Sequence, residues 1–573
     1  MKTDQMDALA QLFKQSMESH PVFSNMDAGK MQEMSKDFFK SFEAMYGGDA
    51  HPFAEWTGTW IKYQTDLAQV WLNAANPEQA TAAPTTDSRF MGDAWNEGIF
   101  PLLRHSYELT AKAMTDLADG AGLPEHEQSK LSFYARVAAD NMAPSNFAIT
   151  NPDVLELAKE TGGKSLVDGF KNLLGDLEKG YITTTDEDAF EVGKNLATTP
   201  GAVIFRNALI EVIQYEPMTA KQRGNPVLIV PPCVNKFYIF DLNEKKSMVR
   251  YLLEQGQSVY MMSWRNPGPD QGDHGWDDYI EQGIFEALKV TSDVSKSKSV
   301  DMLGWCNGGT MLIAALSVLP PELKPLLGSA TFLSSMISFE DPGQVKVFMD
   351  EGQNAAYDMR LKSEKIAPGR DIANAMAMLH VNESIWNFVI SNYLLGKSPA
   401  PFDVLYWNSD TSNLPAKWYS YYIEEMYMAD KLKVPGALTL LGRPVDTRNI
   451  DVPCYFVAAD GDHIVPWKGS YSATPLVSGP AEFVLTTGGH VSGTVINHPT
   501  RNRKRFWTDG NDALDAEGWL GSASVTDGSW WPHWLVWLNE NNPAEDRAKP
   551  KTLGNKTHKA LDPAPGKYVL EQV

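Results

Sequence analysis

One short segment constrains this chain more than any other. A strand-like run, 299–303 (SVDML), leads into Gly304-Trp305-Cys306-Asn307-Gly308, and an apolar helical stretch begins directly afterwards at Thr310. A nucleophile on a sharp strand-to-helix turn needs small neighbours, because the turn is strained and tightly packed. The two glycines that bracket Cys306 meet this need. The segment therefore predicts a nucleophile elbow that presents the Cys306 thiol.

Beyond about Thr185 the sequence alternates between short β-rich runs and helical stretches, with Gly, Pro, Asn and Asp between them. Such alternation is typical of a parallel sheet with helices on its faces. The elbow follows the third run, which favours the α/β-hydrolase fold. The expected strands are 226–231, 258–263, 299–303, 329–334, 454–458 and 482–485.

The chain has 573 residues, more than one hydrophobic core usually organises. Its first part has apolar residues at helical spacing, as in Leu9, Leu12, Phe13 and Met17. We therefore predict a helical N-terminal domain over 1–188 and a catalytic domain over 189–573. Within the latter, residues 338–435 are rich in aromatic residues and Met and lack strand periodicity, which predicts a helical cap insertion.

Two further polar positions follow late strands, in the order that α/β-hydrolases use for their acid and histidine. Asp460 and Asp462 follow the run 454–458, and His490 follows the run 482–485. Spacing alone does not choose between the two aspartates. His463 competes with His490, but it adjoins the acid and precedes the last strand, so we expect a structural hydrogen-bonding role for it.

A tetrahedral intermediate on Cys306 needs hydrogen-bond donors for its oxyanion. The backbone N–H of Asn307, at the start of the following helix, is one natural donor. The loop 231–236 (PPCVNK) follows the first buried strand and offers Cys233 or Val234 as the second, and we name Val234. Cys233 has no elbow and is expected to line the substrate pocket. The pocket candidates are Cys233, Asn235, His463 and Trp407.

Composition excludes several classes of protein. A net charge of −22 disfavours general binding to nucleic acid. The 3 cysteines are far apart in sequence, which predicts neither a disulfide framework nor a metal site and favours a reducing cytoplasm. The first twenty residues lack the apolar core of a signal peptide. The longest apolar stretch, 310–319, is about half the ~20 residues that a transmembrane helix needs, so we expect no transmembrane segment.

Several rare strings resemble one known family. The box Gly304-Trp305-Cys306-Asn307-Gly308-Gly309-Thr310 is similar to the lipase-like box of polyhydroxyalkanoate synthases. The other matching strings lie at 230–236 (VPPCVNK), 263–267 (SWRNP), 276–279 (WDDY), 462–467 (DHIVPW), 489–490 (GH) and 528–531 (GSWW). The resemblance extends from about Met142 to Val569.

The resemblance implies a catalytic triad of Cys306, Asp462 and His490. The chain looks like class I, which polymerises short-chain (R)-3-hydroxyacyl-CoA, such as 3-hydroxybutyryl-CoA, without a second type of subunit. Coenzyme A is then part of the substrate and a product, and no separate cofactor is expected. The family also implies a homodimer in the cytoplasm, associated with polyester granules. The alternatives are a cysteine-dependent thioesterase or polyester depolymerase of the same fold, or a noncatalytic granule-associated protein.

Overall fold

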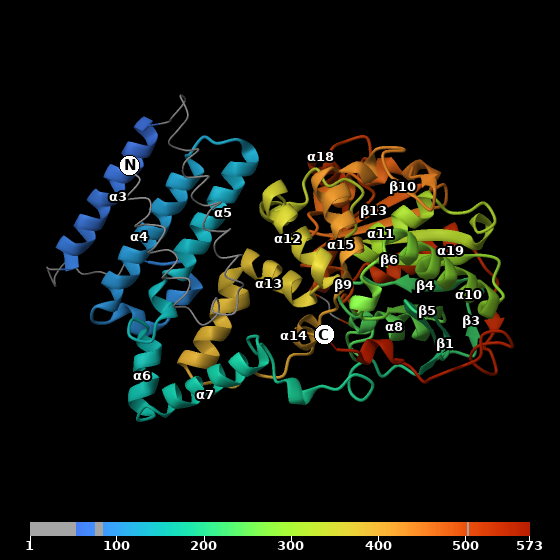
Figure 1. Cartoon of the computed structure of the whole chain (residues 1–573), viewed down its shortest axis with the longest axis horizontal. Helices are drawn as coiled ribbons and strands as arrows, with labels where there is room; N and C mark the ends of the chain where they lie inside the picture. The colour runs from blue at the N-terminus through green and yellow to red at the C-terminus, as the bar shows by residue number, and fades with distance from the viewer. Residues whose placement is uncertain (1–52, 75–83, 501–502, 573) are drawn as a thin grey trace. The chain divides into compact units, whose positions relative to one another are not determined.

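The computed structural model describes residues 53–74, 84–500 and 503–572 (Figure 1). The chain forms two compact units. The first contains the residues up to Asp186 together with 374–400, and the second contains 187–373 and 401–573. The amphipathic pattern at Leu9 to Met17 lies outside the described residues.

The first unit is helical, as its apolar spacing predicts. Helix α6 begins at Pro152, whose fixed φ suits a first helical position, and the side chain of Asn151 accepts the N–H groups of Asp153 and Val154. Its helices before Asp186 are α3 (Phe53–Ala74), α4 (Phe100–Asp119), α5 (Glu125–Asn141), α6 (Pro152–Glu160) and α7 (Lys164–Lys179).

Residues 374–400 belong to this helical unit, although they follow the expected start of the cap. The segment contains the π-helical turns η10 (Asn382–Trp386) and η11 (Val389–Leu394). Trp386 Nε1 donates to Asn141 Oδ1 at 2.9 Å, and the Tyr393 hydroxyl donates to Asp176 Oδ2 at 2.7 Å. The interval 338–435 is therefore divided between the units, and the division falls within α13 (Gly369–Leu379).

The second unit is built on a ten-stranded sheet with the order β1-β2-β5-β4-β6-β7-β12-β13-β14-β15. All six strands expected from the sequence are present and pair in parallel. They are β4 (Pro226–Val230), β5 (Ser258–Trp264), β6 (Val300–Trp305), β7 (Leu327–Leu333), β12 (Cys454–Ala459) and β13 (Ala481–Thr486). This topology, with the elbow after β6, is the predicted α/β-hydrolase fold.

Antiparallel strands extend the sheet at both edges. They are β1 (Gly201–Arg206), β2 (Ile210–Tyr215), β14 (Arg505–Thr508) and β15 (Ser524–Asp527). The strand order reverses at β4, because the next strand in the chain, β5, pairs on one side of β4 and the following one, β6, pairs on the other. In open α/β sheets such a switch point leaves a crevice at the carboxyl ends of the two strands. The loop 231–236 and the elbow at Cys306 both start there.

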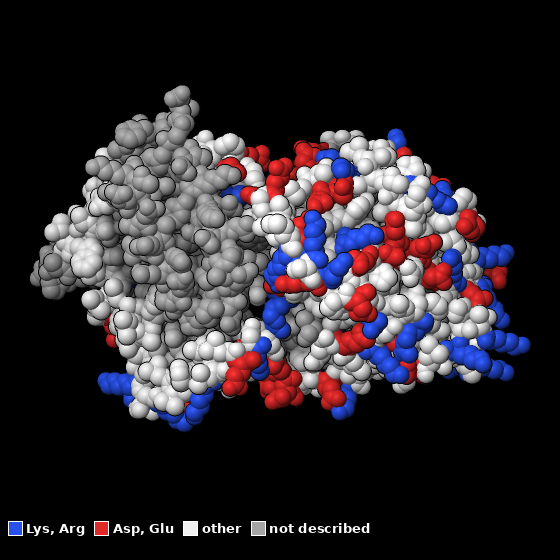
Figure 2. Space-filling model, viewed as in Figure 1, with Lys and Arg blue, Asp and Glu red and all other residues white. Residues whose placement is uncertain are grey.

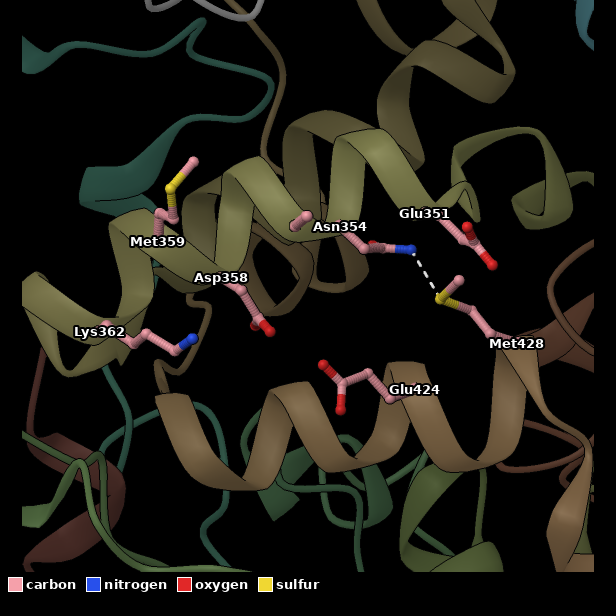
Figure 3. A pocket seen from close by; sticks show the side chains of 8 residues that line it. Glu351, Asn354, Asp358, Met359, Lys362, Glu424 and Met428 are labelled. Carbon is pink, nitrogen blue, oxygen red and sulfur yellow. Dashed lines mark hydrogen bonds between the residues drawn. The ribbon is translucent and has the colours of Figure 1, made fainter.

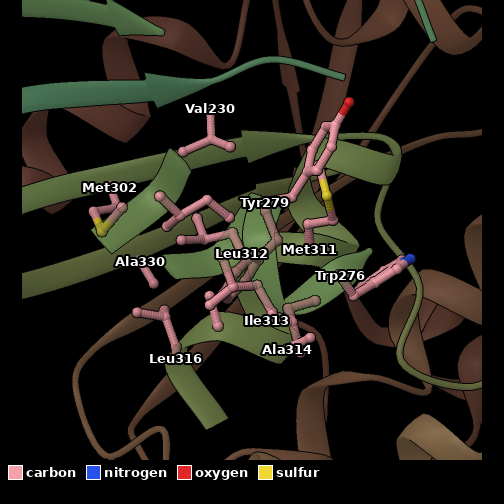
Figure 4. Packing of buried hydrophobic residues seen from close by; sticks show 14 of the residues in the cluster. Val230, Trp276, Tyr279, Met302, Met311, Leu312, Ile313, Ala314, Leu316 and Ala330 are labelled. Carbon is pink, nitrogen blue, oxygen red and sulfur yellow. The ribbon is translucent and has the colours of Figure 1, made fainter. Parts of the chain in front are cut away.

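The core lies on both faces of the sheet. Along β4, Leu228 and Val230 pack in one apolar cluster, whereas Val227 and Ile229 pack in the other, as the alternation of side chains in a strand requires. Every residue of α11 (Asn307–Ser317) is buried. Figure 4 shows its Met311 and Leu312 packed among apolar side chains of the sheet and of the segment at Trp276. This packing fixes the helix that follows Cys306.

The remaining cap elements of the second unit are helical. They include α12 (Glu351–Glu364), α14 (Asp403–Ser409), α15 (Ala416–Tyr421) and the π-helical turn η12 (Tyr422–Met428). Around the sheet lie α8 (Met248–Glu254), α9 (Trp276–Asp278), η7 (Tyr279–Phe285), α10 (Glu286–Ser295), α16 (Trp467–Tyr471), α17 (His490–Gly493), α18 (Ala516–Ser522) and α19 (Trp531–Asn541).

The C-terminal segment closes over the β1–β2 edge of the sheet. Glu211 of β2 is fully buried and accepts the backbone N–H groups of Lys567 and Tyr568 at 3.0 and 3.1 Å. Arg206 donates its Nε to the same carboxylate at 2.7 Å. Because a buried carboxylate is costly without partners, this segment is an integral part of the catalytic unit.

On the face shown in Figure 2, acidic and basic side chains are interspersed over the catalytic unit. Within the part of the chain that the structure describes, no helix combines the length and apolar character needed to cross a membrane.

Candidate active site

Cys306 lies at the junction of β6 and α11 in a strained conformation. Its φ of 55° and ψ of −132° are rarely adopted by residues other than glycine. Its N–H donates to Leu333 O at 3.0 Å, and its carbonyl accepts the N–H of Thr310 at 3.1 Å. These bonds hold the elbow, and the side chain is only partly buried. The elbow thus keeps the thiol accessible at the end of the sheet.

The two bracketing glycines are required by close packing. A Cβ at Gly304 would lie 2.5 Å from the Cα of Gly309. A Cβ at Gly308 would lie 2.4 Å from Pro231 O. Real Cβ atoms do not approach backbone so closely. Gly304 is therefore required by the tight turn of the elbow itself, and Gly308 by the contact between the elbow and the loop 231–236.

The structure brings His490 and Asp462 together below this elbow. The Asp462 Oδ2 to His490 Nδ1 distance is 2.7 Å, and both side chains are buried. Asp462 Oδ1 accepts the N–H groups of Ile464 and Val465, each at 2.9 Å. Asp460 instead accepts the N–H of Gly488 at 2.8 Å and so braces the loop before His490. Asp462 is therefore the aspartate that contacts the imidazole.

The charges of the site favour a protonated imidazole. Burial would lower the pKa of His490, but the charges of Asp462 and Cys306 and hydrogen bonds to both raise it to about 10. Burial would raise the pKa of Asp462, but the charge of His490 and the hydrogen bond to it outweigh burial and lower that pKa. A low-dielectric site strengthens such interactions between charges. The arrangement suits an imidazole that accepts a proton from Cys306 while Asp462 stays ionised.

The two remaining cysteines lie in settings that suppress ionisation. Cys233 is 3% exposed, and burial raises the pKa of its thiol well above the ordinary value. Cys454 is fully buried within β12, and burial raises its pKa to about 12. The thiolate is the reactive form of a cysteine, so burial makes Cys233 and Cys454 poor nucleophiles. Cys306 differs from both because it is only partly buried.

Two tryptophans pack around the imidazole, of which the sequence singled out Trp407 but not Trp305. Trp305 stacks on His490 with ring centroids 5.1 Å apart and an interplanar angle of 29°. Trp407, expected in the pocket, is buried against Trp305 at 6.0 Å and donates its Nε1 to Lys236 O at 2.7 Å. Trp305 precedes Cys306 in the sequence, but this position does not predict which way its ring points.

Two tyrosines of the cap also interact electrostatically with Cys306. Burial, followed by the charges of Tyr427 and Cys306, raises the pKa of Tyr422. Burial and the charge of Cys306 also raise the pKa of Tyr427. Both come from η12, within the aromatic-rich interval expected to form the cap. That composition indicated a cap but did not indicate which of its rings would approach Cys306.

The loop 231–236 is anchored on several sides. Trp264 Nε1 donates to Pro231 O at 2.9 Å, and Ser412 N–H donates to Val234 O at 3.2 Å. The N–H of Cys233 donates to the side-chain Oδ1 of Asn307 at 3.1 Å. The Cys233 N–H is thus already bonded, and the N–H of Val234 stays the predicted second donor beside that of Asn307.

The other pocket candidates occupy different environments. Asn235 is half-buried and forms an isolated antiparallel bridge with Thr411. His463 is exposed next to Asp462, and its ring does not occupy the position of His490. Contact of either side chain with substrate stays a prediction.

An open pocket of about 410 Å³ lies between α12 and η12 (Figure 3). Acidic side chains of Glu351, Asp358 and Glu424 line it together with Met359 and Met428. Its lining does not include Cys306, Asp462 or His490. We therefore place the chemistry at the elbow and not in this pocket.

Comparisons with known proteins identify relatives of the chain. The N-terminal family model of poly-beta-hydroxybutyrate polymerase matches residues 86–252, and the alpha/beta hydrolase fold model matches residues 226–493. The chain is 41% identical over 516 residues to the poly(3-hydroxyalkanoate) polymerase subunit PhaC of Cupriavidus necator, covering 89% of this chain and 87% of that protein.

Two further polymerases match over similar lengths. That of Methylorubrum extorquens is 36% identical over 89% of this chain and 88% of its own. Poly(3-hydroxyalkanoate) polymerase 1 of Ectopseudomonas oleovorans is 36% identical over 86% of this chain and 88% of its own. With such similarity over most of each sequence, and with the hydrolase sheet described above, this chain belongs to the poly(3-hydroxyalkanoate) polymerase family of acyltransferases.

Proposed function

We propose that this enzyme polymerises (R)-3-hydroxyacyl-CoA of short chain length, such as 3-hydroxybutyryl-CoA, and releases CoA through a thioester on Cys306. The observation that carries the proposal is the 2.7 Å contact between Asp462 and His490, with His490 hydrogen-bonded to the Cys306 thiol. The names of the polymerases that match this chain support the class of substrate.

The first step is acyl transfer to the enzyme. His490 removes the thiol proton, and the Cys306 sulfur attacks the thioester carbonyl of the substrate. The oxyanion that forms accepts hydrogen bonds from the backbone N–H groups of Asn307 and Val234, and each such donor contributes roughly 3 kcal/mol. The tetrahedral intermediate then collapses, the bond to the CoA sulfur breaks, and the imidazolium returns its proton to CoA.

The second step extends the polyester. The 3-hydroxyl of another hydroxyacyl unit attacks the acyl group on Cys306, and His490 accepts the hydroxyl proton. An ester bond forms, the bond to Cys306 breaks, and the sulfur regains a proton from the imidazolium. A thioester suits this enzyme because transfer from CoA to Cys306 is nearly isoenergetic, so the acyl group stays activated for the attack by the hydroxyl.

We expect purified enzyme to release many equivalents of CoA from 3-hydroxybutyryl-CoA while the solution becomes turbid. Butyryl-CoA lacks the attacking hydroxyl, so it should release no more CoA than the enzyme present. 3-Hydroxyoctanoyl-CoA should react more slowly than the four-carbon substrate. The measurements are CoA titration, turbidity and chromatography of the acid products. Stoichiometric free 3-hydroxybutyrate without polymer would instead identify a thioesterase.

We also propose that helix α7 contributes to association with the polyester granule and to self-association as a homodimer. Apolar side chains recur along it at helical spacing and are exposed, up to 59% for Phe170. They are Leu166, Val167, Phe170, Leu174 and Leu177. An exposed apolar stripe of this kind is typical of a surface that binds another apolar surface.

The double variant Val167→Asp/Phe170→Asp is expected to bind polymer particles about tenfold more weakly or worse. Full burial of each such side chain contributes about 1.5–3 kcal/mol, and a carboxylate at the polymer surface opposes binding. Co-sedimentation with preformed polyester measures the bound fraction. The matched control is Val525→Asp/Val536→Asp, which changes residues that are 56% and 55% exposed on the catalytic unit. Equal binding by both double variants would show that α7 does not contribute to granule binding.

A further inference from the structure

The side chain of Asn307 forms a direct link between the elbow and the loop 231–236. It is 4% exposed, and its Oδ1 accepts the N–H of Cys233 at 3.1 Å. The same oxygen lies 4.0 Å from the Cys233 sulfur. An amide oxygen at this place gives a buried backbone donor the partner that it needs. The contact joins the residue after the nucleophile to the residue before Val234.

This position gives Asn307 two roles in one residue. Its backbone N–H, at the N-terminus of α11, is one proposed oxyanion donor. Its side chain holds the loop that carries the other proposed donor, Val234. The loop's other hydrogen-bonded anchors come from outside the elbow and include Trp264 at Pro231 O, Ser412 at Val234 O and Trp407 at Lys236 O. The Asn307 bond is thus a side-chain hydrogen bond that links the loop directly to the elbow.

We propose that the Asn307 side chain is a positioning residue, which fixes the Val234 N–H for the oxyanion formed during acyl transfer to Cys306. The proposal rests on the proposed function for the identity of the acyl donor. A neutral amide suits the task, because a carboxylate would oppose the negative charge of the thiolate and of the oxyanion. An apolar side chain would leave the buried Cys233 N–H without its acceptor, and the loop would shift to find another.

Two reactions of the same sulfur test this role. Acylation by 3-hydroxybutyryl-CoA passes through an oxyanion, whereas alkylation by iodoacetamide does not. Asn307→Leu keeps the branching and the number of side-chain heavy atoms but removes the acceptor, and Asn307→Ala leaves a void. For both variants we expect acylation, measured as the first burst of CoA, to slow by about 100-fold, the lower end of the effect of losing one oxyanion donor. Alkylation should stay within about twofold of the unmodified enzyme, because the backbone elbow and His490 are unchanged.

The matched control is Asn225→Ala at the opposite end of β4. Asn225 is 7% exposed, and its Oδ1 accepts the hydroxyl of Ser297 at 2.9 Å. Its replacement should lower thermal stability as replacement of Asn307 does, yet leave the ratio of acylation to alkylation unchanged. This control separates a general loss of buried hydrogen bonding from a specific effect on the oxyanion.

4-Nitrophenyl acetate provides a second acyl donor that does not depend on the proposed substrate. If the unmodified enzyme fails to react with 3-hydroxybutyryl-CoA, the proposed function fails, while the ratio of acetylation to alkylation still tests Asn307. Equal losses in both reactions of Asn307→Leu, or no loss in either, would overturn the positioning role. A lower ratio in Asn307→Leu and Asn307→Ala, with an unchanged ratio in Asn225→Ala, would support it.

Discussion

Replacing Cys306 by alanine is expected to abolish CoA release and polymer formation, with a loss of about 10⁴-fold or more. The variant removes the sulfur that forms the acyl-enzyme, and no other group of the proposed mechanism can replace it. Alanine keeps the Cβ, and the elbow's backbone bonds to Leu333 and Thr310 do not involve the thiol. The fold should therefore survive. CoA titration measures the loss, and circular dichroism and thermal melting check the fold.

The matched controls are Cys233→Ala and Cys454→Ala. Both cysteines are buried, and burial holds the pKa of each thiol above its ordinary value. We expect both variants to keep substantial activity, with some loss of stability from the void. A loss in either control as deep as that of Cys306→Ala would mean that the nucleophile is misassigned. Retained turnover in a folded Cys306→Ala protein would falsify the thioester mechanism.

Replacing Asp462 by asparagine is expected to separate the two steps of polymerisation. An ordinary cysteine thiol has a pKa of about 8.5, so an imidazole without its carboxylate can still partly activate it. Removing the proton of a hydroxyl demands a more basic and better-oriented imidazole. The variant should release a burst of CoA no larger than the enzyme concentration and then stall as a covalent adduct. In serine triads the corresponding change lowers turnover by about 10⁴-fold, and we expect a similar loss in elongation.

Intact-protein mass spectrometry after brief exposure to 3-hydroxybutyryl-CoA will detect the adduct on Cys306. His490→Gln should show little burst, because both steps lose their base. Asp460→Asn is the matched control, since Asp460 bonds the N–H of Gly488 and not the imidazole. The Asp460→Asn variant should lower the stability of the loop before it lowers the rate of CoA release. Normal elongation by Asp462→Asn would show that another carboxylate partners His490.

Much of the catalytic fold could be predicted because its signals are local. The six expected strands match β4, β5, β6, β7, β12 and β13 to within two residues at each end, since a buried parallel strand is a short apolar run between turn residues. The elbow followed from the two glycines around Cys306. The order of the acid and histidine along the chain followed from the topology of the sheet.

Other features depend on contacts between distant segments, which spacing does not encode. The spacing of the residues did not decide whether Asp460 or Asp462 contacts His490, because that contact depends on how the loop turns toward the imidazole. The assignment of 374–400 to the helical unit depends on bonds such as that from Trp386 to Asn141. The direction of the Trp305 ring likewise depends on the packing of His490 and Trp407 around it.

The closure of the C-terminal segment over β2 has a consequence for biosynthesis. Glu211 emerges from the ribosome long before Lys567 and Tyr568, whose N–H groups it accepts. Until residues 567 and 568 are released, the Glu211 carboxylate lacks two of its partners and the β1–β2 edge stays incomplete. We therefore expect this edge of the catalytic unit to be completed late in synthesis, once residues 567 and 568 have left the ribosome.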